Sequence, residues 1–328
     1  MNFSAEFFNP EIAALMMALF WAAILIDLMV GQFVTGKVPS LDALFARVAR
    51  ALVRRLDRSS RTYAELRMRG ILLVMIIIPP LVYAGILANE LLEVGIYGPL
   101  LSALALVPLV AQKHRWQQLI SAGGAISQAK GQLSENGDDI HHTRRLAVAD
   151  TILGFCASLV PLGAWWSVGG FAGLFPYLLV ANLMKAASRR RNGAPASPFF
   201  MLITLLHEVA VAPFAILAAL LVGLAHFFLP GTNLGVFASF NPAATIGLAS
   251  RYFPLNTIAR GLELAVEADI GETTSKPEIK KPVCWVGPTS GRAKLEPAMM
   301  RKVWFVTLIG FSLYGVVTAM IFTLLLLA

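Results

Sequence analysis

The chain has 328 residues, of which 57% are hydrophobic and 14% are charged, whereas about 25% of residues are charged in an ordinary soluble domain. The formal net charge is +8, but the lysines and arginines gather between long apolar runs, which favours membrane topology over nucleic-acid binding. The two cysteines, Cys156 and Cys284, lie far apart and give no support to a disulfide framework or a zinc site. The composition predicts an all-α, polytopic integral membrane helical bundle with membrane lipid as its surroundings.

The first apolar run extends from about Ile12 to Val34 and contains one carboxylate, Asp27. Acidic residues precede this run and a basic leader is missing, so we expect a retained span and not a cleaved signal peptide. A carboxylate in a span usually faces the bundle or an aqueous cavity and pairs with a cation. We expect Asp27 to have such an interior role, although the basic segment that follows would also allow contact with headgroup water.

The segment from Thr35 to Arg69 contains nine lysines and arginines and three acidic residues. Its apolar residues between Leu41 and Leu56 recur at helical spacing, which is typical of an amphipathic helix on the cytoplasmic surface. A solvated charged linker is the alternative.

The next apolar runs are predicted to cross the membrane on either side of a short acidic connection. Gly70 to Ala88 forms the second span, with a kink at Pro79-Pro80. Tyr97 to Ala111 is shorter than a full crossing. The polar segment from Gln112 to Asp150 reads as two cytoplasmic helices, the second beginning near Gly137.

Two further spans form a predicted hairpin. Thr151 to Val168 runs outward, Gly169-Gly170 turns, and Phe171 to Ala186 returns. Lys185 and the arginines that follow it place the returning end at the inner surface, where we expect the Lys185 side chain to extend towards the headgroups.

The run from Phe199 to Leu229 contains the pair His207-Glu208 and Pro213. We expect a surface helix that ends before Pro213, followed by a crossing, with one long tilted helix as the alternative. The His207-Glu208 pair is a functional candidate if it is buried, because a desolvated polar group needs a partner. In an interfacial helix the pair would simply be hydrated.

The last third of the chain combines a basic segment with a final span from Val303 to Ala328. Between Tyr252 and Gly271 an apolar stripe predicts an amphipathic helix against the bundle. The prediction is one membrane domain of 1–328 with seven or eight spans and cytoplasmic segments at about 35–69, 112–150, 187–198 and 251–302.

Three stretches in this order and spacing carry a family resemblance. They are Ile26 to Gly31, similar to Leu-Asp-Leu-x-x-Gly-Asp-Pro; Arg145 to Thr151, similar to Arg-Ala-Val-x-x-Thr; and Lys281 to Gly287, similar to Lys-Pro-Trp-Ile-Gly with one residue inserted. Together they resemble the CobD/CbiB family of integral membrane adenosylcobinamide-phosphate synthases, which act in cobalamin biosynthesis. The resemblance implies ATP-dependent amide formation between adenosylcobyric acid and an aminopropanol-type amine, with Mg²⁺ held by carboxylates.

Departures from the family pattern remove most of its acids. The second acid of the first motif is Gln32 here, and the stretches around Gly154 to Leu159 and around Asn182 contain none. In this respect the chain is similar to the AmpE branch of the superfamily, which implies a non-catalytic membrane scaffold or sensor. The synthase is the first hypothesis and the AmpE-like protein is the alternative, and both imply a bacterial inner-membrane protein with cytoplasmic basic loops.

If the chain is an enzyme, the resemblance implies ATP and Mg²⁺ as cofactors and a corrinoid intermediate as ligand, with no resident metal site assigned. The candidate catalytic residues are Asp27, His207, Glu208 and Glu263. The candidate substrate-binding residues are Asn182, Asn256, Lys281, Trp285, Arg292 and Lys294.

Overall fold

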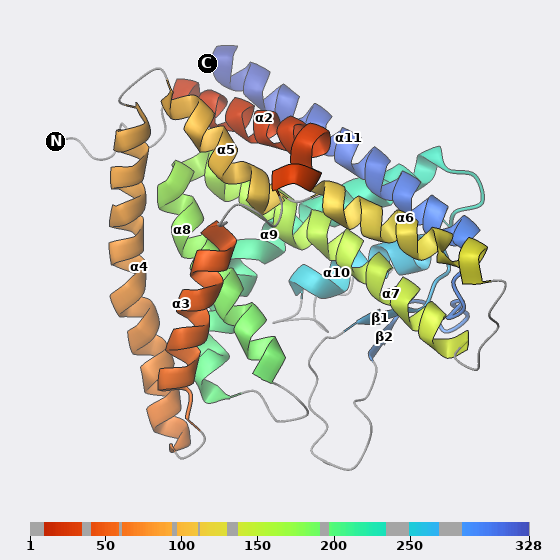
Figure 1. The fold of residues 1–328 in the computed structure, drawn as a ribbon, viewed down its shortest axis with the longest axis horizontal. Helices are drawn as coiled ribbons and strands as arrows, with labels where there is room; N and C mark the ends of the chain where they lie inside the picture. Colours follow the sequence, from red (N-terminus) through yellow and green to blue (C-terminus); the bar gives the residue numbers. More distant parts are fainter. Residues whose placement is uncertain are drawn as a thin grey trace.

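The structure is a computed structural model that describes residues 10–34, 41–58, 61–93, 97–110, 112–129, 137–190, 197–233, 249–268 and 284–327. These residues form an almost entirely helical bundle (Figure 1). The helices are α2 (Pro10–Val34), α3 (Leu41–Leu56), α4 (Tyr63–Glu93), α5 (Gly98–Val110), α6 (Gln112–Ala129), α7 (Gly137–Gly154), α8 (Val160–Arg190), α9 (Met201–Ala225), α10 (Ala249–Gly261) and α11 (Pro297–Leu327). A π-helical turn, Phe155–Leu159, joins α7 to α8, and two 3₁₀ turns, Pro198–Phe200 and His226–Phe228, flank α9.

A short antiparallel ribbon of β1 (Val266–Ala268) and β2 (Cys284–Val286) lies beside α7 and α10. The predicted all-α membrane class is confirmed at the level of helix type, length and apolarity. The two helices expected between residues 112 and 150 are α6 and α7, and α7 begins at the predicted Gly137.

Five helices of the described part are long and apolar enough to cross a membrane. They comprise Ile12–Met29, Tyr63–Glu90, Ile140–Ala187, Pro198–Phe228 and Pro297–Leu325. α5 has only 13 residues and is not among them, because about 20 residues are needed to cross the hydrocarbon core. The predicted count of seven or eight spans is therefore not confirmed.

The third of these segments is itself a hairpin, as the sequence predicted. Gly170 has φ 54° and ψ −133°, a left-handed conformation that glycine tolerates and other residues rarely adopt. Beyond this turn the chain runs back, because the Tyr177 hydroxyl donates to the Ser158 carbonyl at 3.4 Å. In one straight helix these residues would be about 28 Å apart.

Asn89 of α4 holds the turn of the hairpin. Its side-chain amide donates to the Gly169 carbonyl at 3.2 Å, and its side-chain oxygen accepts from the Phe171 N–H at 2.9 Å. One side chain thus bonds the backbone on both sides of the reversal and helps to satisfy its polar groups.

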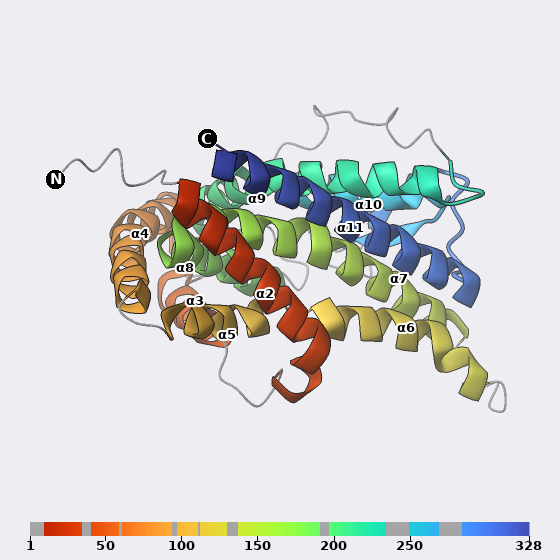
Figure 2. The same ribbon diagram turned by 90° about the horizontal axis from the view of Figure 1, so that it is seen from above.

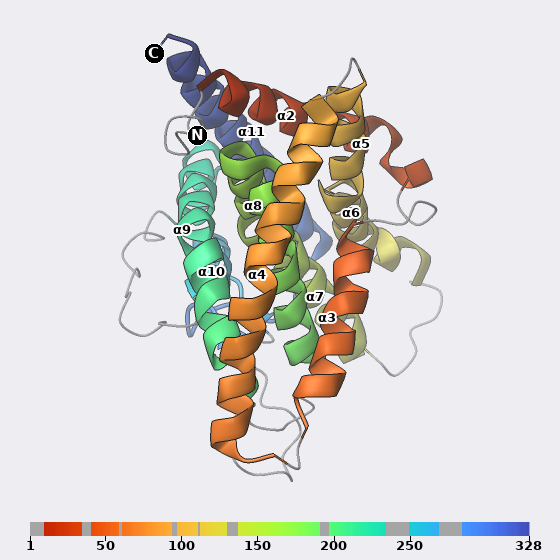
Figure 3. The same ribbon diagram turned by 90° about the vertical axis from the view of Figure 1, so that its left-hand side faces the viewer.

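The hairpin occupies the centre of the bundle. In the candidate span at residues 140–187, 67% of the residues are buried. The corresponding share is 11% in the span of α4 and 17% in the span of α11. α4 therefore lies at the edge, along α8 (Figure 3). On another side, α11 packs against both α2 and α9 (Figure 2).

α3 is the predicted amphipathic helix and packs against α8. Phe45, Ala49 and Val53, spaced by four residues, form its buried face, while Arg47 and Arg50 are exposed. Leu44 and Val48 remain exposed as well, so the apolar stripe is wider than the face that α8 covers.

The predicted break before Pro213 is wrong. α9 continues through Pro213 from Met201 to Ala225, which agrees with the alternative of one long helix. A proline removes one helical N–H, but surrounding helices and local backbone adjustment make such a residue tolerable in a membrane helix.

The helix predicted from Tyr252 to Gly271 is too long. α10 ends at Gly261, a turn follows at Leu262 and Glu263, and β1 begins at Val266. Long-range pairing with β2 and the segment at Arg292 replaces the local helical pattern here.

We predict that Gly170→Ala lowers the stability of the protein by about 1–2 kcal/mol, because an L-residue is strained in the left-handed region. The added Cβ would also lie 2.6 Å from Asn89 Oδ1. Thermal unfolding in detergent measures the effect. The control is Gly169→Ala, whose Cβ would meet nothing within 4 Å. Equal melting temperatures for the two variants would contradict the role of Gly170.

Candidate polar site in the bundle

The π-helical turn provides the first element of the candidate site. A π-helical turn shifts hydrogen bonding from i→i+4 to i→i+5 and frequently occurs at functional sites. Here the Gly154 carbonyl accepts from Arg115 Nη1 at 2.9 Å, and Arg115 Nη2 approaches Ser158 Oγ at 3.5 Å. Arg115 of α6 is thus bound to the point where α7 changes into the π-helical turn.

Close approach of Arg115 depends on the glycine. A Cβ at Gly154 would lie 2.5–2.8 Å from the Cδ, Nε and Cζ atoms of Arg115. Burial lowers the pKa of the Arg115 guanidinium, and the negative charges of Asp150 and Asp42 are among the groups that oppose this. Because the ordinary pKa of arginine is above 12, the side chain stays charged at neutral pH. The site therefore has a permanent positive charge.

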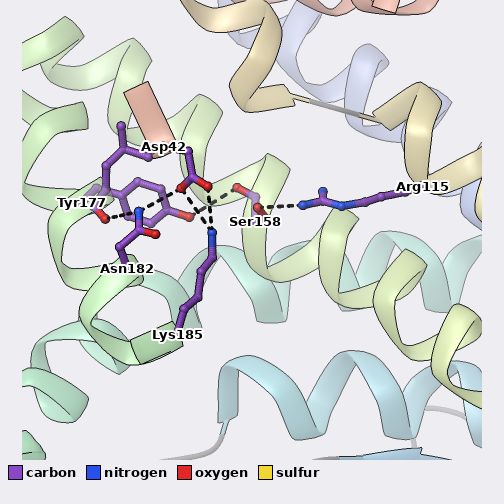
Figure 4. A network of polar contacts seen from close by, with 7 residues as sticks. Asp42, Arg115, Ser158, Tyr177, Asn182 and Lys185 are labelled. Atoms are coloured by element: carbon purple, nitrogen blue, oxygen red, sulfur yellow. Dashed lines mark hydrogen bonds and ion pairs between the residues drawn. The ribbon is translucent and has the colours of Figure 1, made fainter. Parts of the chain in front are cut away.

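A second cluster lies on the other side of Ser158 (Figure 4). Asn182, which is 2% exposed, donates to Asp42 Oδ1 at 2.8 Å and to the Leu178 carbonyl at 2.9 Å. Lys185 Nζ lies 3.2 Å from Asp42 Oδ1. The lysine that was expected to extend towards lipid headgroups is in an ion pair with α3.

Tyr177 connects the two clusters in space. Its hydroxyl donates to the Ser158 carbonyl, next to the hydroxyl that faces Arg115 (Figure 4). The side chains of Lys185 and Asp42 are 59% and 38% exposed, whereas Tyr177 is 7% exposed. The polar groups therefore extend from the protein surface into the bundle, where a guanidinium can bind an anionic group or hold helices together.

Asp27 is fully buried, as the prediction of an interior role required. Its Oδ2 accepts from the Lys113 N–H at 3.0 Å, in the first turn of α6. Aspartate is among the preferred acceptors for the free N–H groups at a helix start. The carboxylate of Asp27 therefore stabilises the start of α6. The bonded residue, Lys113, lies two residues before Arg115.

His207 and Glu208 lie within α9, with side chains 11% and 12% exposed. Glu208 accepts from the Ser250 N–H at 3.1 Å and from the Ser250 hydroxyl at 2.8 Å. The carboxylate therefore stabilises the amino-terminal turn of α10. His207 Nδ1 lies 3.8 Å from Glu208 Oε1.

Three other candidates lie in or near the last turns of α10, and the contacts join Glu263 to Arg292 and Asn256 to Arg260. Asn256 is 3% exposed and accepts from Arg260 Nε at 3.2 Å. The Glu263 carbonyl accepts from the Arg292 N–H at 2.9 Å. A small pocket of about 80 Å³ lies here, lined by Asn233, Arg260, Glu263, Pro288 and Ser290.

The remaining candidates lie around the β-ribbon or outside the described part. Trp285 is 50% exposed, and the Arg145 guanidinium lies 5.0 Å from its ring centroid, a cation–π contact. Lys294 is exposed. Lys281 lies outside the described residues.

Sequence reasoning missed Asp42, Arg115, Ser158 and Tyr177. Arg115 stands in a predicted cytoplasmic helix, where a basic residue is ordinary, and Asp42 stands at the start of the predicted amphipathic helix. The one available signal was Gly154, a glycine inside an otherwise regular helical pattern, which often marks close packing.

The comparisons with known proteins found no relative. No protein-family model, no curated protein and no solved structure matches the chain. The resemblance to CobD/CbiB and AmpE proteins therefore stays a prediction.

We predict that Arg115→Gln lowers the stability of the protein by about 1–3 kcal/mol, because the Gly154 carbonyl loses a charged donor. The control is the neighbouring His114→Ala, an exposed position where about 0.5 kcal/mol or less is expected. Thermal unfolding of both variants measures the difference. A glutamine variant as stable as the native protein would show that the Arg115 contacts contribute nothing to the fold.

Proposed function

We propose that this chain is a non-catalytic scaffold or sensor of the bacterial inner membrane, similar to AmpE and derived from the CobD/CbiB fold. Its basic segments lie on the cytoplasmic side, as the positive-inside rule requires. The protein has no ligase activity of its own in this proposal.

The bonding of the candidate catalytic acids carries the proposal. The Asp27 carboxylate accepts a backbone N–H at the start of α6, and the Glu208 carboxylate accepts two hydrogen bonds at the start of α10. A catalytic carboxylate has to reach the substrate or a metal ion within hydrogen-bonding or ligand distance. Carboxylates that already bind different helix ends support a structural role.

The polar site around Arg115 supports the sensor part of the proposal. Its side chains come from α3, α6 and both arms of the central hairpin. The Asp42–Lys185 ion pair at its exposed edge and Arg115 inside the bundle are joined through the hairpin. A ligand that changes this ion pair would act directly on helix packing.

The synthase is the second candidate, and the pocket at the end of α10 favours it. Glu263 lines this pocket, and the exposed Arg292 and Lys294 follow closely in sequence after Pro288 and Ser290, which also line it. Such cations could contact phosphate groups or corrin carboxamides, with ATP and Mg²⁺ as cofactors.

Titration calorimetry separates the two functions. We expect no heat of binding when the purified full-length protein in detergent is titrated with ATP–Mg²⁺, alone or after addition of adenosylcobyric acid. Nucleotide binding, together with formation of the amide product once an aminopropanol-type amine is added to the same mixture, would replace the scaffold with the synthase. As the cellular control, expression of the chain should leave a synthase-deficient cobalamin auxotroph without growth.

We also predict that Asp27→Ala and Glu208→Ala each lower stability by about 1–3 kcal/mol, because partly buried donors at helix starts lose their acceptors. The control is Glu90→Ala in α4, an exposed position. Melting temperatures in detergent provide the measurement. Two variants that melt with the Glu90→Ala control would remove the structural role of these acids.

A further inference from the structure

The end of α10 contains a residue in an unfavourable backbone conformation. Glu263 has φ 54°, and it is the one non-glycine residue of the described part with positive φ. The Leu264 N–H donates to the Ala259 carbonyl at 2.7 Å, and the Glu263 N–H donates to the Arg260 carbonyl at 3.3 Å. These two bonds define a Schellman motif with Glu263 at the left-handed position, where glycine is the usual residue.

The surrounding backbone fixes this conformation. The Glu263 carbonyl accepts from the Arg292 N–H at 2.9 Å, and the Ala265 N–H donates to the Arg292 carbonyl at 3.1 Å. The turn is thus clamped to the segment that precedes α11. A glycine at this position would fit the same bonds with less strain, so the packing of the turn gives no reason for a glutamate side chain.

Glu263, an exposed residue, lines the small pocket together with Arg260. Asn256, buried inside α10, accepts from Arg260 Nε at 3.2 Å and so orients the guanidinium. Asn233, Ser290 and Pro288 complete the lining. One positively charged residue, held by Asn256, and one negatively charged residue therefore border the same space.

The pocket is small and opens to solvent, since Glu263 and Ser290 are exposed, and its volume favours a small occupant. A volume of about 80 Å³ corresponds to about six water molecules, or to an organic molecule with about five to seven non-hydrogen atoms. A guanidinium pairs with a carboxylate in a bidentate geometry, and a carboxylate pairs with an ammonium group. A single small molecule that carries both a carboxylate and an ammonium group can therefore pair with both Arg260 and Glu263.

We propose that this pocket binds a small zwitterion of the amino-acid type, with its carboxylate at Arg260 and its ammonium group at Glu263. The carboxylate of Glu263 serves binding, while its left-handed backbone conformation lowers the stability of the turn. Strain of this kind is common at binding sites. The proposal goes beyond the scaffold function and does not depend on it. Neither the polar site around Arg115 nor the carboxylates of Asp27 and Glu208 take part in the binding.

The test titrates the full-length protein in detergent with glycine, L-alanine and β-alanine, and with ethanolamine and acetate as molecules of one charge. We expect at least one zwitterion to bind at least tenfold more tightly than either singly charged molecule. Equal binding of ethanolamine or acetate, or no binding of all three zwitterions at millimolar concentration, would overturn the proposal.

Two substitutions at one position separate binding from folding. Glu263→Gln keeps the backbone strain and removes the charge, so zwitterion binding should fall at least tenfold while the melting temperature changes little. Glu263→Gly relieves the strain, so binding should be lost while the melting temperature rises by about 2 °C. Retained binding in Glu263→Gln would sink the idea. As a control, Glu65→Gln in the first turn of α4 should bind the zwitterion like the native protein.

Discussion

Polar groups inside an apolar bundle have to find their partners within the protein, because neither lipid nor packed side chains can replace water. This constraint accounts for the arrangement at the centre of the fold. The carbonyl of Gly154 receives a charged donor from Arg115, and Asn89 binds the backbone on both sides of the turn at Gly170. The two solutions hold opposite ends of one hairpin arm, and α4 and α6 are attached to the hairpin through them.

The same constraint bears on function. A carboxylate in a span is a functional candidate by default, since its burial costs free energy. For Asp27 and Glu208 this cost is offset by helix starts whose N–H groups also need acceptors. Burial of an acid in a helical membrane protein is therefore weak evidence of catalysis until its hydrogen-bond partners are known.

Sequence reasoning succeeded where the signal was local. Apolar run length predicted the long helices, Gly169-Gly170 predicted the hairpin, and Gly137 predicted the start of α7. It failed where tertiary contacts decide. Neighbouring helices allow α9 to pass through Pro213, and pairing with a distant segment ends α10 early.

The candidate site shows the same division more sharply. Asn182 was identified, but its partner Asp42 is 140 residues away and on another helix, and no local pattern joins them.

Glu263 was identified as one acid among several, but its backbone conformation appears only once the turn is built. The sequence gives no direct sign that a glutamate adopts a left-handed backbone conformation. The residues around Glu263 follow a helical pattern, and this pattern predicts a helical conformation for Glu263 as well. Strain at Glu263 and the fixed guanidinium of Arg260 are thus the observations that distinguish this acid from Asp27 and Glu208, whose carboxylates serve the fold. Asp27 and Glu208 stabilise helix starts, whereas the strained backbone of Glu263 destabilises the end of α10. The two kinds of acid therefore have opposite effects on the stability of the protein. That sign, more than burial or charge, separates the structural carboxylates of this protein from the functional candidate.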